Sequence, residues 1–135
     1  MAKPILCLDF DGVIHSYTSG WKGADVIPDP PVPGALQFIL DAQKHFTVAI
    51  FSSRSNQAGG QFAMQEWLTD WSREWASEDP ARWPSSDWRH NMLASIEWPL
   101  EKPAAFITID DRAITFDGTW PDVETLRVFK PWNKR

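Results

Sequence analysis

Acidic and hydroxyl side chains stand at the ends of three short apolar segments of this sequence. The segment ILCLDF ends with Asp9 and Asp11, TVAIF is followed by Ser52 and Ser53, and AFITI is followed by Asp110 and Asp111. Several carboxylates gathered in one small site raise one another's pKa, so such a cluster is costly without a counter-charge. A hard divalent cation removes that cost, and oxygen donors without a histidine or cysteine cluster favour Mg2+.

The spacing of Asp9 and Asp11 indicates that the two carboxylates have different chemical roles at one site. Residues two apart on a strand point the same way, whereas Phe10 points into the core, so both carboxylates can face one pocket. Gly12 lets the backbone turn sharply and approach a ligand closely. One carboxylate can attack an electrophile and the other can transfer protons, while Ser52 donates a hydrogen bond to a phosphoryl oxygen.

Three strands of one parallel sheet are needed to bring these residues together. The unbroken apolar runs at 5–10, 47–51 and 105–109 are typical of strands buried on both faces. Between the first two runs, Pro33 and Gly34 open a segment with Leu36, Ile39 and Leu40 at helical spacing, which predicts a right-handed crossover helix. In open parallel sheets, ligands bind beyond the carboxyl ends of the strands, where all six polar residues fall.

Further elements follow the second strand. An aromatic and apolar stripe between residues 61 and 75 predicts a helix that packs its tryptophans against the sheet; its members are Met64, Trp67, Leu68, Trp71 and Trp75. Pro80 and Pro84 end this helix, and Ser85 or Ser86 is a candidate N-cap for another helix that starts near Asp87. RAITF (112–116) and TLRVF (125–129) read as one or two further strands.

Length and composition favour one compact domain over residues 1–135. Thirteen basic and eighteen acidic residues give a net charge of −5, so a nucleic-acid partner is possible but is not indicated by charge. The single cysteine, Cys7, has no partner for an internal disulfide, and the N-terminus lacks a signal-peptide layout. No apolar run approaches the ~20 residues that a membrane span needs, and we expect a cytoplasmic protein.

The ordered set Asp9-Phe10-Asp11-Gly12, Ser52 and Asp110-Asp111 resembles the phosphatase branch of the haloacid dehalogenase (HAD) superfamily over nearly the whole chain. The resemblance implies a Rossmann-like three-layer α/β sandwich with a mostly parallel central sheet. It implies a Mg2+-dependent phosphomonoester hydrolase in which Asp9 is the nucleophile that becomes an aspartyl phosphate and Asp11 is the general acid and base. Ser52, with Ser53 and Gly12, is expected to bind phosphate. Asp9, Asp110 and the backbone carbonyl of Asp11 are expected to coordinate Mg2+, with Asp111 in support.

The family also uses a cation, usually lysine, to offset the phosphate charge. Lys102 matches the pattern by type, but it lies eight residues before Asp110. An extended segment of that length would carry it ~26 Å away, at about 3.3 Å per residue. Arg89 lies 21 residues before Asp110, and Arg54 follows the serine pair directly. Lys102 and Arg89 stay equal alternatives for this role, with Arg54 as a third candidate.

Many members of the family enclose the substrate with a cap domain. Residues 13–32 are too short for one, and the longer stretch 56–101 must supply the helices of the core, so we expect no full cap. Residues 13–32 can form a short flap in which Tyr17, Trp21 and Lys22 reach over the pocket. His15 lies directly behind the two aspartates, and whether it contacts substrate stays open.

Two other functions compete with hydrolysis. A catalytically silent HAD-like module would bind phosphate and Mg2+ in a regulatory role. These ligands would raise its thermal stability, and it would show no turnover. A receiver-like signalling domain would keep a long-lived phospho-aspartate, although the paired acids at 110–111 fit it poorly. An open site would accept a phosphorylated small molecule or a macromolecular end, and an oligomer with a partner subunit as lid is possible.

Overall fold

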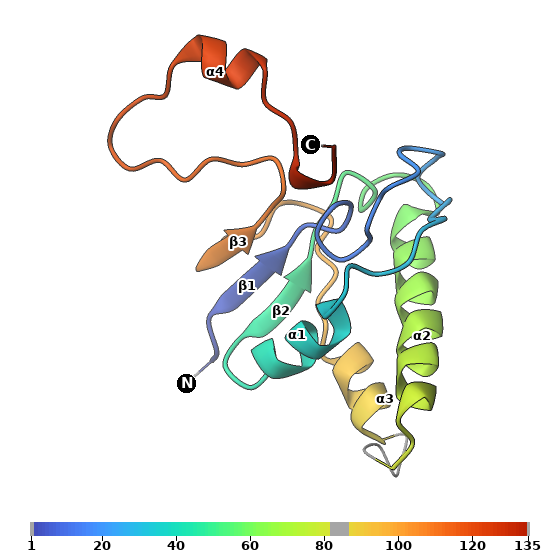
Figure 1. Cartoon of the computed structure of the whole chain (residues 1–135). Coiled ribbons are helices and arrows are strands. Elements are labelled where there is room, and N and C mark those ends of the chain that lie inside the picture. Colours follow the sequence, from blue (N-terminus) through green and yellow to red (C-terminus); the bar gives the residue numbers. More distant parts are fainter. Residues whose placement is uncertain (1, 82–86, 135) are drawn as a thin grey trace.

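A three-stranded parallel sheet forms the centre of the computed structural model, which describes residues 2–81 and 87–134 (Figure 1). The strands are β1 (Ile5–Leu8), β2 (Thr47–Ile50) and β3 (Ile107–Ile109), in the order β2-β1-β3. Ile5 pairs with Thr47 and Leu6 pairs with Ile107. Beyond β2, Glu97 adds one parallel bridge to Ala49. The parallel α/β sheet is thus confirmed, with strands shorter than the apolar runs, but the expected burial of the third run on both faces is wrong, because all three residues of β3 are exposed.

Three helices connect and cover the strands. The crossover helix α1 (Ala35–Ala42) joins β1 to β2, and the tryptophan-rich helix α2 (Gly60–Glu78) follows β2. Helix α3 (Asp87–Ala94) begins where the second proline-bounded helix is expected, while its candidate caps Ser85 and Ser86 lie outside the described residues. Within the described ranges, no helix combines the length and apolar character needed to cross a bilayer.

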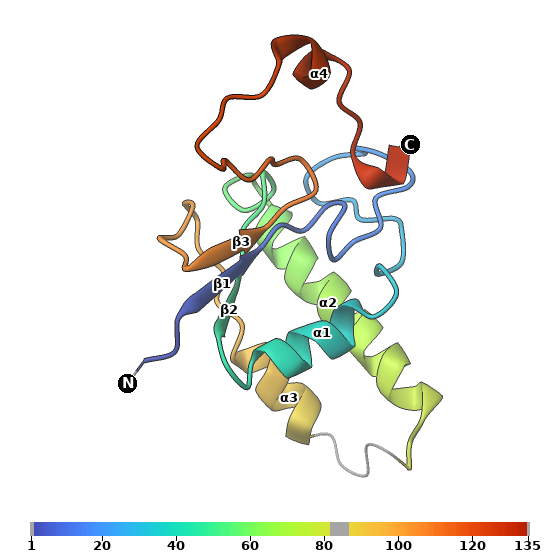
Figure 2. The same cartoon turned by 60° about the vertical axis from the view of Figure 1, so that its left-hand side comes forward.

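The helices lie on one side of the sheet, so the full three-layer sandwich is not confirmed (Figure 2). Residues 98–106 return from Glu97 to β3 without forming a helix. Pro99 and Pro103 interrupt this connection, and each proline lacks the N–H that a helix interior requires. The layer expected on the second face is therefore not formed by this connection.

The core lies between the sheet and the helices. Its fully buried apolar side chains include Leu8, Ile50, Ile39, Met64 and Leu68 from β1, β2, α1 and α2, together with Phe10 and Ile14 after β1 and Met92 from α3. Trp67 packs edge-on against Phe10 with ring centroids 5.1 Å apart, and its indole N–H donates to the Asp29 carbonyl at 3.0 Å. Trp71 and Trp75 are partly buried against the same cluster. The expected packing of the aromatic stripe is confirmed.

The prediction of one or two further strands near the C-terminus is wrong for the described residues. Residues 112–116 form no regular element, and residues 123–127 form the short helix α4 (Val123–Arg127). We call residues 112–131 the C-terminal arm, because in both views they form a long excursion beyond the carboxyl ends of the strands (Figures 1 and 2). The arm returns at the 3-10 helix η1 (Trp132–Lys134). Isolated two-stranded hairpins are marginal in water, so strand-like sequence alone did not suffice here.

Candidate functional site

Three carboxylates meet where β1 and β3 end. Oxygen atoms of Asp9, Asp110 and Asp111 all lie within 4.8 Å of one another. The sheet produces this meeting, because the pairing of β1 with β3 continues for one more residue and the Asp9 N–H donates to the Ile109 carbonyl at 3.0 Å. Asp9 is thereby fixed beside the start of the Asp110-Asp111 pair. The predicted union of these three acids is found in the structure.

The electrostatics of this cluster favour a bound cation. Burial, followed by the charge of Asp110, raises the pKa of Asp9 to about 8. Burial also raises the pKa of Asp111. Ionisation of both Asp9 and Asp111 therefore costs free energy unless a positive charge lies beside them. Asp111 Oδ1 is buried and has no hydrogen-bond partner in the described part of the chain. An all-oxygen set with an unpartnered buried acceptor fits Mg2+, which prefers carboxylate ligands.

Gly12 is required for the position of Asp111. Its φ of +83° is in the left-handed region, which favours glycine. A Cβ atom at residue 12 would also overlap Asp111 Oδ2 and Cγ. The Gly12 carbonyl accepts a hydrogen bond from the Trp132 indole at 2.7 Å, so the start of η1 is tied to the same turn. The close backbone approach expected of this glycine is made to a site carboxylate.

Asp11 has different surroundings from Asp9, although the two are separated by one residue. Its Oδ2 accepts a hydrogen bond from Arg54 Nε at 2.9 Å, and its Oδ1 lies 2.9 Å from His15 Nδ1. The Asp29 backbone N–H donates to His15 Nε2 at 3.1 Å, so Nδ1 carries the ring hydrogen and donates to Asp11. Both oxygens of Asp11 are thus held as acceptors. Its side chain is not one of the three that form the acid cluster.

Arg54 is the cation that contacts the predicted site. Its side chain is fully buried, and its Nη1 donates to the carbonyls of Gly23, Ala24 and Val26. The ring of Trp21 lies 4.6 Å from the guanidinium carbon. Arg54 therefore joins Asp11 to the flap, residues 13–32, which it holds over this side of the site. Its Nη2 is buried without a hydrogen-bond partner in the ranges described.

The two cations ranked equally from sequence are not found beside the acid cluster. Arg89 lies on α3, which Figure 1 shows at the opposite end of α2 from the strand ends. Lys102 lies on the return connection. Lys102 is close enough to β1 to affect Cys7. Burial and the charge of Asp9 raise the pKa of the Cys7 thiol, and the charge of Lys102 partly offsets this increase. Among the described contacts, neither cation pairs with Asp9, Asp110 or Asp111.

The loop after β2 carries the serine pair. Ser52 is buried, its N–H donates to Ser55 Oγ at 2.9 Å, and its Oγ accepts the Arg54 N–H at 3.1 Å. Among the described contacts, the Ser52 hydroxyl accepts this hydrogen bond and donates none. Ser53 is exposed on the same turn. The two hydroxyls differ in exposure, and the tight turn keeps Ser52 next to the arginine that holds Asp11.

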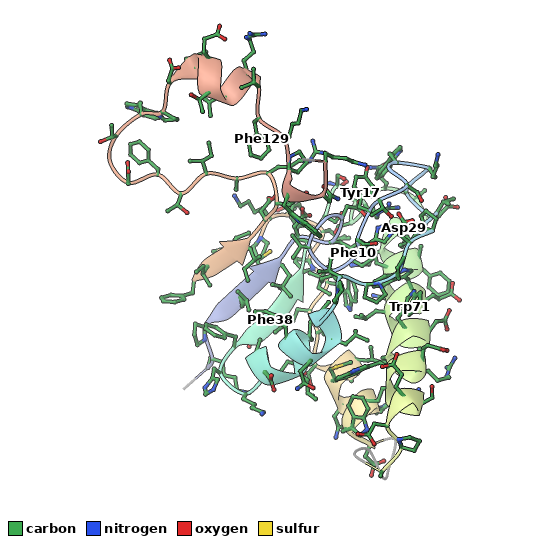
Figure 3. All side chains as sticks on the ribbon, viewed as in Figure 1. Phe10, Tyr17, Asp29, Phe38, Trp71 and Phe129 are labelled. Carbon is green, nitrogen blue, oxygen red and sulfur yellow. The ribbon has the colours of Figure 1, made fainter. Side chains whose placement is uncertain are left out.

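Three further residues contact the site without having been predicted. Asp29 orients His15 through its backbone, and its carboxylate accepts hydrogen bonds from Ser19 N and Oγ at 2.8 and 2.5 Å. Figure 3 shows Asp29 and Tyr17 on the flap above Phe10. Arg112 lies 3.9 Å from Asp111 Oδ2, and its position directly after the acid pair was the available signal. Trp132, which binds Gly12, had no sequence signal, because 120 residues separate the two.

Comparisons with known proteins returned no match: no family model, no curated protein and no solved structure corresponds to this chain.

Proposed function

We propose that this chain is a Mg2+-dependent phosphomonoester hydrolase of the HAD type, which acts through an aspartyl phosphate on Asp9. The observation that carries the proposal is the separation of two neighbouring carboxylates into different environments. Asp9 belongs to the acid cluster, whereas Asp11 accepts hydrogen bonds from Arg54 and His15. Pairs of titratable groups with divergent surroundings are typical of sites that divide nucleophilic and acid-base roles.

In the first half-reaction, a carboxylate oxygen of Asp9 forms a bond to phosphorus as the bond from phosphorus to the ester oxygen breaks. The leaving oxygen receives a proton from Asp11. In the second half-reaction, Asp11 takes a proton from water, whose oxygen attacks phosphorus and frees Asp9 and inorganic phosphate. The donors on Asp11 suit this acceptor role, and the proton gained serves the next leaving group.

Asp9, Asp110 and Asp111 would hold the Mg2+ ion, with the backbone carbonyl of Asp11 as a further oxygen ligand. When bound, the ion neutralises the carboxylates and the negative charge of the phosphoryl group. Ser52, Ser53 and the Gly12 turn would contact the phosphoryl oxygens. Arg112 Nε forms a long ion pair with Asp111 Oδ2 at 3.9 Å, and the arginine side chain is well exposed. Arg112 would therefore add positive charge at the mouth of the site.

The proposed site accepts substrates of different sizes, because in the described structure a short flap, held by Arg54, covers this edge. A phosphorylated small molecule or a phosphorylated macromolecular end would both reach an edge of this kind. A silent phosphate-binding and Mg2+-binding module would use the same residues without turnover, and the experiment below separates the two.

The test is hydrolysis of p-nitrophenyl phosphate with Mg2+, with EDTA as the metal-free arm. We expect turnover that EDTA abolishes and that Asp9→Asn lowers by about 10³-fold or more. The matched control is Asp70→Asn, which removes an exposed carboxylate of α2 that pairs with Arg73. Wild-type-like turnover in Asp9→Asn would contradict the nucleophile. Mg2+-dependent thermal protection without turnover over a broad phosphomonoester panel would favour the silent module.

A further inference from the structure

The C-terminal arm leaves its large apolar side chains exposed. Seven large apolar residues of the arm have exposed fractions between 40% and 83%; they are Ile114, Phe116, Trp120, Val123, Leu126, Val128 and Phe129. The arm packs mainly on itself, with the rings of Phe116 and Trp120 4.7 Å apart. Exposed apolar patches of this extent are typical of protein interaction sites.

The surface area of the whole chain shows the same excess. The chain exposes 8610 Å², whereas a compact monomer of its mass is expected to expose about 7,200 Å². The excess is roughly 1,400 Å² for each chain. A stable protein interface buries about 800 Å² on each partner. One copy therefore carries more uncovered surface than a stable dimer requires.

A receiving surface lies on the same molecule. An apolar groove of about 230 Å³ runs between β3 and α1, lined by side chains that include Val13, Val32, Phe38, Ile39 and Ile109. Phe38 and Ile109 remain substantially exposed there. Within the described residues, β3 pairs with β1 alone, so its outer edge keeps free backbone N–H and C=O groups. A free edge of this kind is a template for pairing with another chain.

We propose that the C-terminal arm is a dimerisation element, which packs into the groove between β3 and α1 of a second copy and lies along the free edge of its β3. The same chain carries the apolar arm and the apolar groove, so two copies can satisfy each other reciprocally around a twofold axis. The segment RAITF is rich in residues that favour strands, and it pairs with no strand in the described part of the chain.

Both ends of the arm are fixed to their own chain. Arg112 N–H donates to Asp110 Oδ1 at 2.8 Å at one end, and Trp132 binds the Gly12 carbonyl at the other. The arm is thus presented as a closed loop, and Figure 3 shows Phe129 on this loop, well separated from Phe38 on α1. The inference does not depend on the proposed hydrolysis, because no catalytic group takes part in it.

The first test is the mass in solution by light scattering during gel filtration. We expect wild type to elute at twice its 15.4 kDa mass, and Phe116→Asp to raise the dimer dissociation constant at least 100-fold. The control is Phe62→Asp, which charges an exposed phenylalanine on α2 and leaves the dimer intact. Circular dichroism verifies that both variants are folded. A monomeric wild type, or a dimer unaffected by Phe116→Asp, would overturn the proposal.

The second test distinguishes exchange between copies from closure of the arm onto its own groove. Phe38→Cys and Phe116→Cys are mixed as separate proteins and treated with a short bis-maleimide, while Cys7 is buried. We expect a cross-linked species of two chains in the mixture and not in either variant alone. A double variant that cross-links within one chain, with no two-chain product, would overturn exchange.

Discussion

Asp9 and Asp11 are separated by one residue, yet the fold gives them different neighbours. The ladder between β1 and β3 brings Asp9 to Asp110, and burial with this like charge raises the pKa of Asp9 to about 8. Asp11 lies past the end of the ladder, where Arg54 from the β2 loop and His15 from the flap reach it. The difference arises from backbone pairing rather than from residue type, because both side chains are aspartates.

The raised pKa of Asp9 predicts how Mg2+ binding depends on pH. In the metal-free folded protein Asp9 holds its proton up to about pH 8, while in the unfolded chain it loses it near the ordinary value of 3.8. Between these values the folded state binds more protons, so the contribution of Asp9 to the free energy of unfolding falls as pH rises. Mg2+ must displace this proton, and its affinity should rise up to about tenfold per pH unit below pH 8.

Calorimetric titration of the protein with Mg2+ across this pH range measures the effect. Asp9→Asn should bind Mg2+ weakly and should show a smaller pH dependence than wild type, because Asp111, whose pKa burial also raises, is still present. A wild-type affinity that stays constant between about pH 6 and 8 would contradict a protonated Asp9.

Gly12 gives a second prediction at this scale. Gly12→Ala should remove Mg2+-dependent thermal stabilisation, because the new Cβ would overlap the Asp111 carboxylate. Gly20→Ala is the matched control. Gly20 has a similar φ of +76°, and a Cβ atom added there would have no other atom within 4 Å. Both variants incur the left-handed backbone cost, and only Gly12→Ala should lose the response to Mg2+ in a thermal melt. Equal responses would show that Asp111 does not depend on this glycine.

Most of the acid site could be predicted from sequence, because carboxyl ends of parallel strands meet by topology. The cation could be narrowed to three candidates, but sequence alone could not choose among them. Lys102 and Arg89 were favoured by motif and spacing, whereas Arg54 reaches Asp11 because the tight turn Ser52–Ser55 points it back under Trp21. Such a contact depends on the path of the flap, which sequence periodicity does not specify. For the same reason the role of His15 behind Asp11 stayed open.

The flap is the element whose stability depends most on one side chain. Arg54 supplies hydrogen bonds to three flap carbonyls and to Asp11 from a fully buried position. Arg54→Ala leaves Asp11 without its ion partner, and removal of one partner of a buried pair costs about 3–5 kcal/mol. We expect that loss in urea unfolding, together with faster amide exchange at residues 23–26.

The control for this prediction is Arg73→Ala on the exposed face of α2. Arg73 lies 3.5 Å from Asp70, and both side chains are well exposed. Loss of a surface pair of this kind changes the free energy of unfolding by about 1 kcal/mol or less. If Arg54→Ala behaved like Arg73→Ala, the flap would not depend on the buried arginine.

The strands β1 and β2 and the helix α2, which have buried faces, were predicted well, and β3 was predicted although its residues are exposed, whereas the C-terminal strands were not found in the described part of the chain. The runs that became β1 and β2, and the stripe that became α2, bury side chains at regular periods. RAITF and TLRVF have strand-like composition, but strand formation requires a neighbouring strand, and TLRVF instead overlaps α4. Local sequence contains no information on whether that neighbour is present within the chain.

At the scale of the whole molecule, the sheet carries its helices on one side and its acid cluster at one edge (Figure 2). The return connection to β3, which contains Pro99 and Pro103, adds no helix to the second face of the sheet. The net charge of −5 and the clustered carboxylates both favour attraction of a cation to this edge. The C-terminal arm begins directly after Asp111, so the proposed dimer contact would start beside the acid cluster.

The central claim is that Asp9 forms a covalent bond to phosphorus. The most direct measurement is borohydride trapping of the enzyme during turnover of p-nitrophenyl phosphate with Mg2+, followed by peptide mass spectrometry. Borohydride reduces an acyl phosphate to the alcohol, so we predict homoserine at position 9 in wild type and none after EDTA treatment. Homoserine at another aspartate, or full turnover with residue 9 unmodified, would contradict the account.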